Sequence, residues 1–441
     1  MRGRSSAPAR ARARGPVTAA LALLLAAPVA GCARHDSRTT LRFWGMGREG
    51  EVVQELVRDF ERERPDIHVI VQQIPWSAAH EKLITGYVGR STPDVSQLGN
   101  TWVPEFAALK AIEPLRPWLA RSTALDSAAF FPGVWDTNVL DGQPYGVPWY
   151  VDTRVLFYRK DVLKRAGYDA MPQRWDEWKR AMHAVKRIVG PDKFAIFLPT
   201  NEWNPPVILG LQSGSPLLSD DATRAAFTDP AFRRGFDFYL SLFREGLAPP
   251  VSNTQIANVY QEFARGYFNM YITGPWNLGE MRNRMPADLQ DDWATAPLPG
   301  PDGPASGVSL AGGSSLVLYR ASRHHAEGWA LIEYLSRPDV QLKFWRLTGD
   351  LPGRVEAWRD TALAADANTR AFEEQLRRVV ATPKVPEWEQ IAMRLQDQVE
   401  RVVRGTVTAD TALAQLSREV DGMLEKRRWL RERALLARGS R

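Results

Sequence analysis

From residue 41 onward the sequence alternates between strand-length apolar segments and segments with a helical period. Residues 41–44 and 67–71 have strand character, and Pro93-Asp94-Val95 begins a third strand. Residues 51–62 repeat apolar positions at three- and four-residue intervals, Pro65 ends this helix, and a second helix spans 77–88. This βαβαβ order predicts an α/β fold with a doubly wound, mainly parallel sheet and helices on both faces.

The alternation continues and predicts a second α/β unit. We expect helices at 175–189 and 232–243 and strands at 194–198 and 267–272. From residue 323 onward helices dominate, at 326–335, 340–347, 372–380, 391–403 and 408–424. Segment 297–304, rich in Pro and Gly, is the strongest break and predicts a crossing between lobes. Two α/β runs without a long linker indicate two lobes that meet at a cleft.

The only cysteine, Cys32, follows a short apolar run and an arginine-rich start without acidic residues. This order is typical of a secretory signal, and Val29-Ala30-Gly31-Cys32 resembles the bacterial lipobox. The resemblance implies that 1–31 is a signal peptide and that Cys32 is lipidated, which would hold an exported chain at the outer face of the cell membrane or in the periplasm. The alternative is an ordinary cleaved signal. The apolar stretch 17–30 is too short to span a bilayer.

Charge gives little reason to expect a nucleic-acid partner. The chain has 57 Lys and Arg against 51 Asp and Glu, and five of the arginines lie in the leader. A nucleic-acid surface needs a clustered basic patch. The clear cluster is the C-terminal tail, which is either a solvated helix end or a contact with anionic lipid. Its residues are Lys426, Arg427, Arg428, Arg431, Arg433, Arg438 and Arg441.

Signatures of catalysis and of cofactors are weak or missing. Residues 45–50 fit G-x-G-x-x-G, but the second strand ends Val71-Gln72-Gln73 without the acid that would hold a ribose. We therefore expect no dinucleotide cofactor, and interpret 45–50 as a loop and helix start that can meet ligand oxygens. No His pair has metal-ligand spacing, so no metal is expected. A glycosidase-like carboxylate pair stays open as an alternative.

Tryptophan is the most informative residue type for function. The chain has 16 Trp, several of them among polar residues at predicted strand ends. An indole offers a flat apolar face and one N–H donor, which suits the C–H face and hydroxyl rim of a sugar. Core packing is the alternative for each of them, whereas a binding cleft is favoured for the set. The set comprises Trp44, Trp76, Trp102, Trp149, Trp203, Trp276 and Trp388.

Nine segments, in order along the chain, resemble the family 1 extracellular solute-binding proteins of ABC importers, the group that contains maltose-binding protein. They include P-D-V at 93–95, G-x-x-Y-G-V-P at 142–148, L-F-Y-R-K-D at 156–161 and F-x-x-G-x-x-x-M-x-x-x-G-x-W at 263–276. Arg159 replaces the usual Asn of the third of these motifs. The other segments are 41–45, 60–69, 172–177, 312–313 and 349–352.

The resemblance implies a two-lobed periplasmic-binding-protein fold with several crossovers and a helical C-terminal region. It implies a first lobe of 32–150 plus 301–352 and a second lobe of 151–300 plus 353–441. The implied function is non-catalytic: a monomer captures a carbohydrate in the cleft and delivers it to the importer permease. The alternatives are another polyol, such as a glycerophosphodiester, or an enzyme acting on glycans.

The same resemblance implies the ligand-binding residues. Asp152 matches the family's cleft carboxylate, and Trp276 matches the aromatic on which a sugar stacks. For Arg48 and Arg354 the alternative is a surface ion pair, and for Trp149 it is packing beneath the hinge. The full expected set is Trp44, Gly45, Arg48, Glu49, Trp76, Asn100, Thr101, Asp152, Trp203, Asn204, Trp276, Gly313, Arg354 and Trp388.

Overall fold

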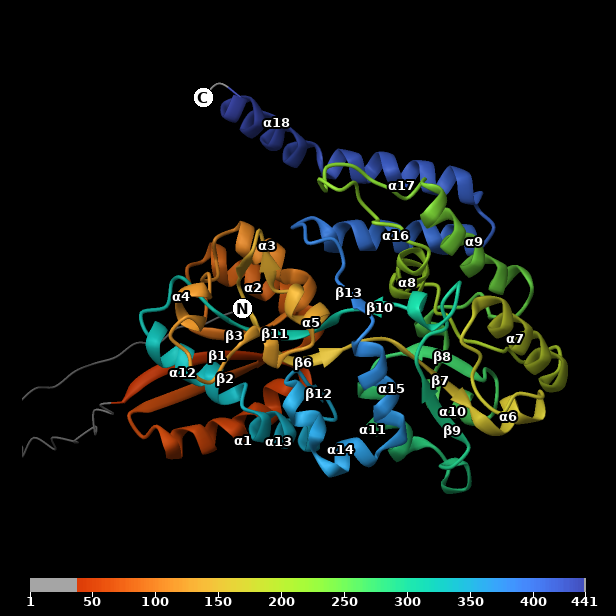
Figure 1. The fold of residues 1–441 in the computed structure, drawn as a ribbon, viewed down its shortest axis with the longest axis horizontal. Helices are drawn as coiled ribbons and strands as arrows, with labels where there is room; N and C mark the ends of the chain where they lie inside the picture. The colour runs from red at the N-terminus through yellow and green to blue at the C-terminus, as the bar shows by residue number, and fades with distance from the viewer. Residues whose placement is uncertain (1–37, 440–441) are drawn as a thin grey trace, which may run out of the picture. The chain divides into compact units, whose positions relative to one another are not determined.

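A computed structural model describes residues 38–439, in which two α/β lobes lie side by side (Figure 1). The predicted signal peptide and Cys32 lie outside the described residues. Residues 38–441 form one compact unit. The helices within residues 38–439 are too short or too polar to cross a membrane.

The first lobe is built on a six-stranded sheet in the order β12-β6-β11-β3-β1-β2. Its first half is the predicted βαβαβ unit: β1 (Thr39–Met46), α1 (Gly47–Glu63), β2 (Ile67–Ile74), α2 (Trp76–Val88) and β3 (Val95–Gly99). The other strands are β6 (Val147–Asp152), β11 (Gly312–Leu318) and β12 (Leu351–Pro352).

Strand direction differs from the prediction of a mainly parallel sheet. β1 pairs in parallel with β2 and β3, but β11 is antiparallel to β3 and β6, and β12 is antiparallel to β6. The parallel part comes from local crossovers through α1 and α2. β11 enters the sheet after the chain has passed through the second lobe, and no local periodicity shows the direction in which it returns.

Helices cover both faces of the first sheet, as predicted. Alternate side chains of β1 enter different clusters, because successive residues of a strand point to opposite faces. Phe43 packs with α1, α12 (His325–Leu335) and α13 (Pro338–Thr348), whereas Trp44 packs with α2 and α3 (Val103–Ala108). Trp149 is fully buried and stacks on Phe344, so packing is its role.

The second lobe has a smaller, antiparallel sheet in the order β8-β7-β9. Its strands are β7 (Val155–Arg159), β8 (Met270–Thr273) and β9 (Trp293–Ala296). The predicted strand 194–198 forms only isolated parallel bridges beside β8, from Phe194 and Phe197. The predicted helix 372–380 corresponds to α15 (Ala367–Leu376) followed by the two-residue strand β13 (Val379–Val380).

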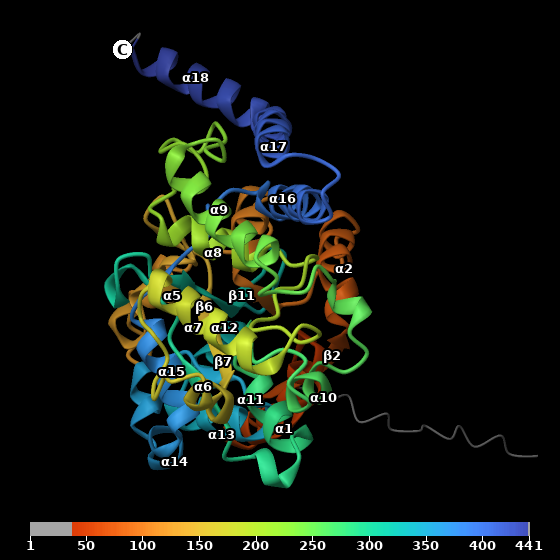
Figure 2. The same cartoon turned by 90° about the vertical axis from the view of Figure 1, so that its right-hand side faces the viewer.

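Helices surround this second sheet, and the C-terminal helices lie at the top of the molecule as seen in Figure 2. The helices of this lobe are α6 (Lys160–Arg165), α7 (Trp175–Val189), α8 (Asn204–Gln212), α9 (Pro230–Arg244), α10 (Val259–Ala264), α11 (Trp276–Arg284), α16 (Trp388–Val403), α17 (Ala409–Met423) and α18 (Glu425–Gly439). The helices predicted at 175–189, 232–243, 391–403 and 408–424 are confirmed as α7, α9, α16 and α17.

Short elements complete the chain and connect the lobes. A hydrophobic cluster joins Val151 and Leu351 of the first sheet with Phe157 of the second. The remaining elements are α4 (Arg116–Leu119), α5 (Pro132–Asp136), β4 (Val139–Leu140), β5 (Gln143–Pro144), β10 (Ser309–Leu310), α14 (Thr361–Ala365) and the 3₁₀ turns η1 (Asn100–Trp102), η2 (Ser127–Ala129), η3 (Asn253–Gln255), η4 (Ala287–Leu289), η5 (Pro304–Ser306) and η6 (Val355–Arg359).

Candidate functional site

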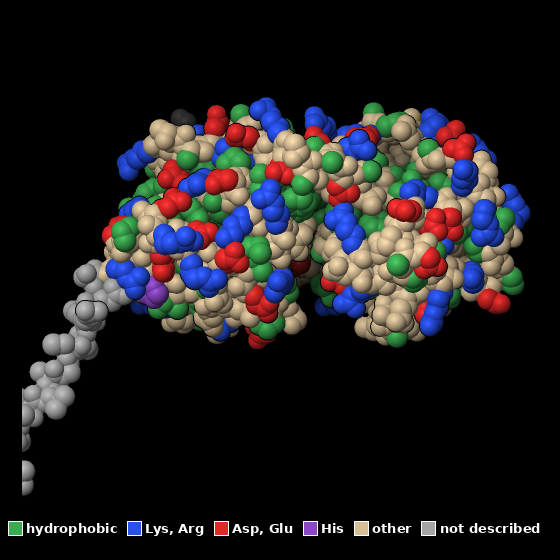
Figure 3. Space-filling view, turned by 90° about the horizontal axis from the view of Figure 1, so that it is seen from below, with side chains coloured by type: hydrophobic (Ala, Val, Ile, Leu, Met, Phe, Trp, Pro, Cys, Tyr) green, Lys and Arg blue, Asp and Glu red, His purple; other side chains and the backbone are tan. Residues whose placement is uncertain are grey.

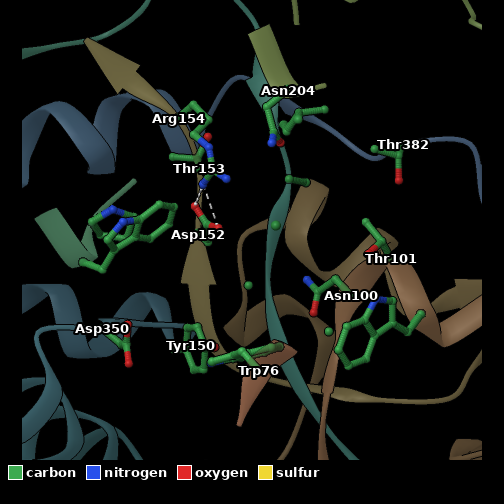
Figure 4. Close-up of a pocket in the computed structure, with 18 of the residues that line it drawn as sticks. Trp76, Asn100, Thr101, Tyr150, Asp152, Thr153, Arg154, Asn204, Asp350 and Thr382 are labelled. Carbon is green, nitrogen blue, oxygen red and sulfur yellow. Dashed lines mark hydrogen bonds and ion pairs between the residues drawn. The ribbon is translucent and has the colours of Figure 1, made fainter. Parts of the chain in front are cut away.

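A cavity of about 610 Å³ lies between the two lobes (Figure 4). The molecular surface is also hollowed between them, as Figure 3 shows from below. The first lobe contributes Arg48, Glu49, Trp76, Gly99, Asn100, Thr101, Trp102, Tyr150, Asp152, Gly312, Gly313 and Asp350 to the cavity wall. The second lobe and the connections contribute Thr153, Arg154, Trp203, Asn204, Pro275, Trp276, Leu310, Ala311, Thr382 and Glu389.

Strand ends and helix starts place these side chains. β3 and β6 end at the cavity, and α1, α2, α8 and α11 begin there. Ligands of open α/β sheets bind at this edge because loops gather beyond the carboxyl ends of parallel strands. The first turn of a helix can direct N–H groups outward. In α8, however, Pro205 and Pro206 have no N–H, and in α11 the N–H groups of Asn277 and Leu278 are already bonded. The cavity therefore relies mainly on side-chain groups.

Indole rings form the apolar part of the wall. Trp76 and Trp276 are 38% and 42% exposed, which is unusual for side chains of this size. Trp76 meets Trp102 edge to face, with ring centroids 5.8 Å apart. The Trp276 ring lies directly against Gly274, where a Cβ would collide with it. Glycine at this position therefore allows the ring to lie where it does.

Asp152 and Arg154 form an ion pair beside Trp276. One guanidinium nitrogen, Nη1 of Arg154, donates to both carboxylate oxygens of Asp152, at 2.6 and 2.9 Å. The guanidinium carbon lies 4.5 Å from the centroid of the Trp276 ring. Both charged side chains are mostly buried, at 16% and 23% exposure. This pair makes Asp152 an oriented acceptor next to an aromatic face.

A buried hydrogen-bond network holds Glu49 on the first-lobe side. The Tyr150 hydroxyl donates to Glu49 Oε1 at 3.0 Å and accepts from Gln97 and Ser314. The Trp76 indole N–H donates to Glu49 Oε2 at 3.4 Å. Burial raises the pKa of Glu49, and these hydrogen bonds oppose the shift. The network fixes the carboxylate at the start of α1, where it faces the cavity.

Asp350 is the second buried carboxylate of this region. Its residue is 8% exposed, and burial together with the nearby charges of Glu49 and Asp152 raises its pKa to about 8. Among residues 38–439, neither Asp350 nor Glu49 forms an ion pair with a Lys, Arg or His side chain. Glu49 and Asp350 therefore bind protons more tightly than isolated carboxyls do, and a protonated carboxyl of this pair can donate a hydrogen bond.

We expect Asp350→Asn to flatten the dependence of stability on pH. The folded pKa of about 8 lies above the ordinary value of 3.8, so the folded chain binds this proton more tightly than the unfolded chain does. The free energy of unfolding should therefore fall as pH rises between these values, by up to about 1.4 kcal/mol per pH unit. Urea unfolding at pH 6, 7 and 8 measures the slope. Equal slopes for wild type and variant would contradict the raised pKa of Asp350.

Glu389 of α16 links the second lobe to the first across the cavity. Its carboxylate accepts side-chain hydrogen bonds from Thr101 and Trp102 of η1, and burial raises its pKa. His80 lies nearby, in contact with the Trp102 ring and bonded to Glu105 at 2.6 Å. The two lobes are therefore joined at the cavity rim by polar contacts as well as by the covalent connections.

The structure brings ten of the fourteen sequence-predicted residues to the cavity wall. Arg48 lines the wall and also forms the alternative surface ion pair, with Glu51 at 3.0 Å. Whether these side chains bind ligand stays a prediction. The ten are Arg48, Glu49, Trp76, Asn100, Thr101, Asp152, Trp203, Asn204, Trp276 and Gly313.

Two predicted residues of the first lobe, Trp44 and Gly45, lie outside the cavity wall. Trp44 is 7% exposed and packs in the cluster between the sheet and α2. Gly45 faces Gly50, where an added Cβ would lie 2.7 Å from the Gly50 Cα. The first and last glycines of G-x-G-x-x-G therefore allow β1 to approach α1 closely, which explains the motif without a dinucleotide.

The other two, Arg354 and Trp388, are also placed in packing roles. Arg354 donates to the carbonyl of Ala124 at 2.9 Å and lies over the Phe130 ring, so it packs against the segment 124–130 of the first lobe. It also forms the alternative ion pair, with Glu356 at 3.9 Å. Trp388 is 1% exposed and contacts Trp203 edge to face, with centroids 5.6 Å apart. It supports a cavity residue from behind, because α16 turns its side chain into the core.

Sequence reasoning missed several cavity residues that stand beside predicted ones. Tyr150 and Arg154 flank Asp152 at two-residue spacing, which places them near it in extended backbone. Trp102 belongs to the tryptophan set for which a binding cleft is favoured, but it is left out of the expected ligand-binding residues although it directly follows Asn100 and Thr101. Asp350 lies in the family-like segment 349–352 and Glu389 directly follows Trp388, but neither carboxylate was assigned to the cavity, because most of their cavity neighbours are far away in sequence. The described residues contain no group of three His, Cys, Asp or Glu placed to hold a metal ion.

Comparisons with known proteins agree with this arrangement. Residues 45–342 match the family described as bacterial extracellular solute-binding protein. The sugar-binding protein MalE from Xanthomonas citri is 52% identical, with a TM-score of 0.86 over 89% of this chain and 99% of that chain. A solute-binding protein of Thermotoga lettingae, solved with α-D-tagatose, is 26% identical, with a TM-score of 0.74 over 88% of this chain and 100% of that chain.

A curated relative extends the likeness to a named oligosaccharide binder. The diacetylchitobiose-binding protein DasA of Streptomyces coelicolor is 24% identical over 401 residues, which cover 88% of this chain and 89% of that protein. The family match spans more than half of the chain, and it confirms the resemblance found in the sequence motifs. The chain belongs to the family 1 extracellular solute-binding proteins of bacterial ABC importers.

Proposed function

We propose that this protein captures a carbohydrate in the cavity between its lobes and delivers it to the permease of an ABC importer. The observation that supports this proposal most directly is the exposed Trp276 ring beside the oriented carboxylate of Asp152. A sugar ring can stack its C–H face on the indole while its hydroxyls donate to the carboxylate. The relatives named above for sugars make a carbohydrate the first ligand class to test.

Capture follows from the placement of ligand groups on both lobes. Glu49, Trp76 and Asn100 come from the first lobe, whereas Asn204 and Trp276 come from the second. We propose lobes of 32–150 plus 301–352 and of 151–300 plus 353–441, except that Val151 and Asp152 extend strand β6 of the first sheet and so belong with the first lobe. A ligand that contacts both stabilises the closed arrangement, and hinge closure of this kind is a recurrent binding motion. The closed, liganded monomer is then the form that the permease would accept.

A saccharide panel tests the proposal. Mono-, di- and trisaccharides, including maltose, diacetylchitobiose and tagatose, are screened by thermal shift and then by calorimetry. A ligand that binds only the folded chain raises the melting temperature. Binding without turnover supports the proposal. Binding of a glycerophosphodiester with no sugar bound would favour the polyol alternative, and a hydrolysis product would favour the glycan-acting enzyme.

We also propose lipid attachment at Cys32. Cys32→Ser is expected to release the protein from membranes while the melting temperature stays unchanged, because residues 38–441 form a compact unit of their own. Membrane fractionation and melting curves of both forms measure this. Mass spectrometry of the wild-type N-terminal peptide is the control, and a peptide without acyl mass at Cys32 would contradict the proposal.

A further inference from the structure

The C-terminal helix α18 lies on the outside of the second lobe and extends away from it in both views (Figures 1 and 2). Residues 425–441 include seven Lys and Arg against two Glu. The solute-binding function described above uses none of these residues. Two large apolar side chains of the same helix, Trp429 and Leu430, are each 51% exposed. The helix therefore presents apolar and basic groups together.

One side of α18 accounts for its attachment to the lobe. Arg427 pairs with Glu387 at 3.1 Å, Arg428 donates to the carbonyl of Thr223 at 3.0 Å, and Arg431 donates to the carbonyl of Asp221 at 3.0 Å. On a helix, positions 427, 428 and 431 share one side. These three arginines hold the helix in place, so their donors are already engaged.

The opposite side of α18 has a different composition. Lys426, Trp429, Leu430 and Arg433 stand at i, i+3, i+4 and i+7, which places them on one face. All four are exposed, and the Arg433 guanidinium lies 4.7 Å from the centroid of the Trp429 ring. The two acids of the helix, Glu425 and Glu432, fall outside this face. This face, called the outward face below, is thus positive, with an indole and a leucine at its centre. Its edge formed by Lys426 and Leu430 also borders a surface hollow lined by Glu105 and Leu109.

We propose that this outward face of α18 binds an anionic lipid surface. Trp and Leu between Lys and Arg are the composition by which helices lie at a membrane–water boundary. A stable protein partner buries about 800 Å² per side, which two apolar side chains do not supply. Each basic residue near an anionic membrane increases partitioning about fivefold, so Lys426 and Arg433 give the charge complementarity. A chain already held at the membrane needs only weak affinity to dock.

Vesicle flotation tests the proposal without any sugar ligand. The protein is residues 32–441 with Cys32→Ser, which cannot be acylated and retains the whole compact unit. The vesicles are pure phosphatidylcholine or phosphatidylcholine with one third phosphatidylglycerol. We expect flotation with the anionic vesicles at low salt, weakening as salt is added, and none with the neutral ones. Absence of flotation with anionic vesicles at low salt overturns the proposal and leaves the face to a protein partner.

Matched variants locate the binding face. Lys426→Glu/Arg433→Glu is expected to lower partitioning by at least about tenfold. Lys164→Glu/Arg165→Glu on α6 changes the net charge equally at exposed positions and should retain most of the binding. Equal loss in both double variants would overturn the proposal, because net charge alone would explain it. Melting curves check folding, and Trp429→Ala, with a several-fold loss expected, gives the same test if the first variant melts early.

Discussion

Trp388→Ala is expected to lower the free energy of unfolding by about 3–5 kcal/mol. Trp388 is 1% exposed and belongs to the largest side chains of the second-lobe core, where it packs with Ile391, Leu395 and Trp203. Its indole N–H has no hydrogen-bond partner, so the loss comes from packing and from the cavity left behind. Urea unfolding followed by circular dichroism measures the midpoint and the slope.

Trp276→Ala is the matched control for stability. The same atoms are removed from a side chain that is 42% exposed, so less apolar area returns to water on unfolding. We expect a loss below about 1 kcal/mol, as for substitutions outside the core. A small loss at Trp388, or equal losses at the two positions, would show that α16 does not bury Trp388 as described.

Trp276→Ala is expected to weaken sugar binding by about ten- to a hundredfold, or about 1–3 kcal/mol. The indole lies at the start of α11 and lines the cavity, where its 42% exposure leaves a broad apolar face open to a ligand. Its removal also takes away the surface beneath the Arg154 guanidinium, which leaves the Asp152 pair less well held. Calorimetric titration with the best saccharide of the panel measures the change.

Trp429→Ala is the control for affinity. Trp429 is 51% exposed and lies on α18, outside the cavity wall. Sugar affinity of this variant should equal that of wild type, since no cavity residue contacts the ring. An unchanged affinity of Trp276→Ala, in protein shown to be folded, would remove Trp276 from the ligand site and with it the main support for stacking.

Local sequence was sufficient to predict the elements near the start of each lobe. The strands at 41–44 and 67–71 and the helix at 175–189 appear where the apolar periods place them. Such periods report which side of an element faces a core, and they need no knowledge of distant residues. The ordered motifs likewise identified the family, because loops between these elements recur at the same chain positions.

Individual site residues were less predictable, because burial depends on neighbours far along the chain. Trp44 and Trp388 were predicted as cleft residues on the same grounds as Trp76 and Trp276, yet the first two pack in cores and the others line the cavity. The choice depends on which way each helix turns against its sheet. No pattern within a few residues contains that information.

By itself, the sequence determined the alternating α/β elements, the two lobes and the family of this protein. Tertiary structure decided the direction of β11, the joining of Glu49 with Asp350 in one buried region, and the contact of Glu389 with Thr101 across the cavity. The physical reason is the distance along the chain over which each effect acts. Periodicity and turn chemistry act over a few residues, whereas these contacts join residues hundreds of positions apart, and their energies depend on burial that only the packed chain creates.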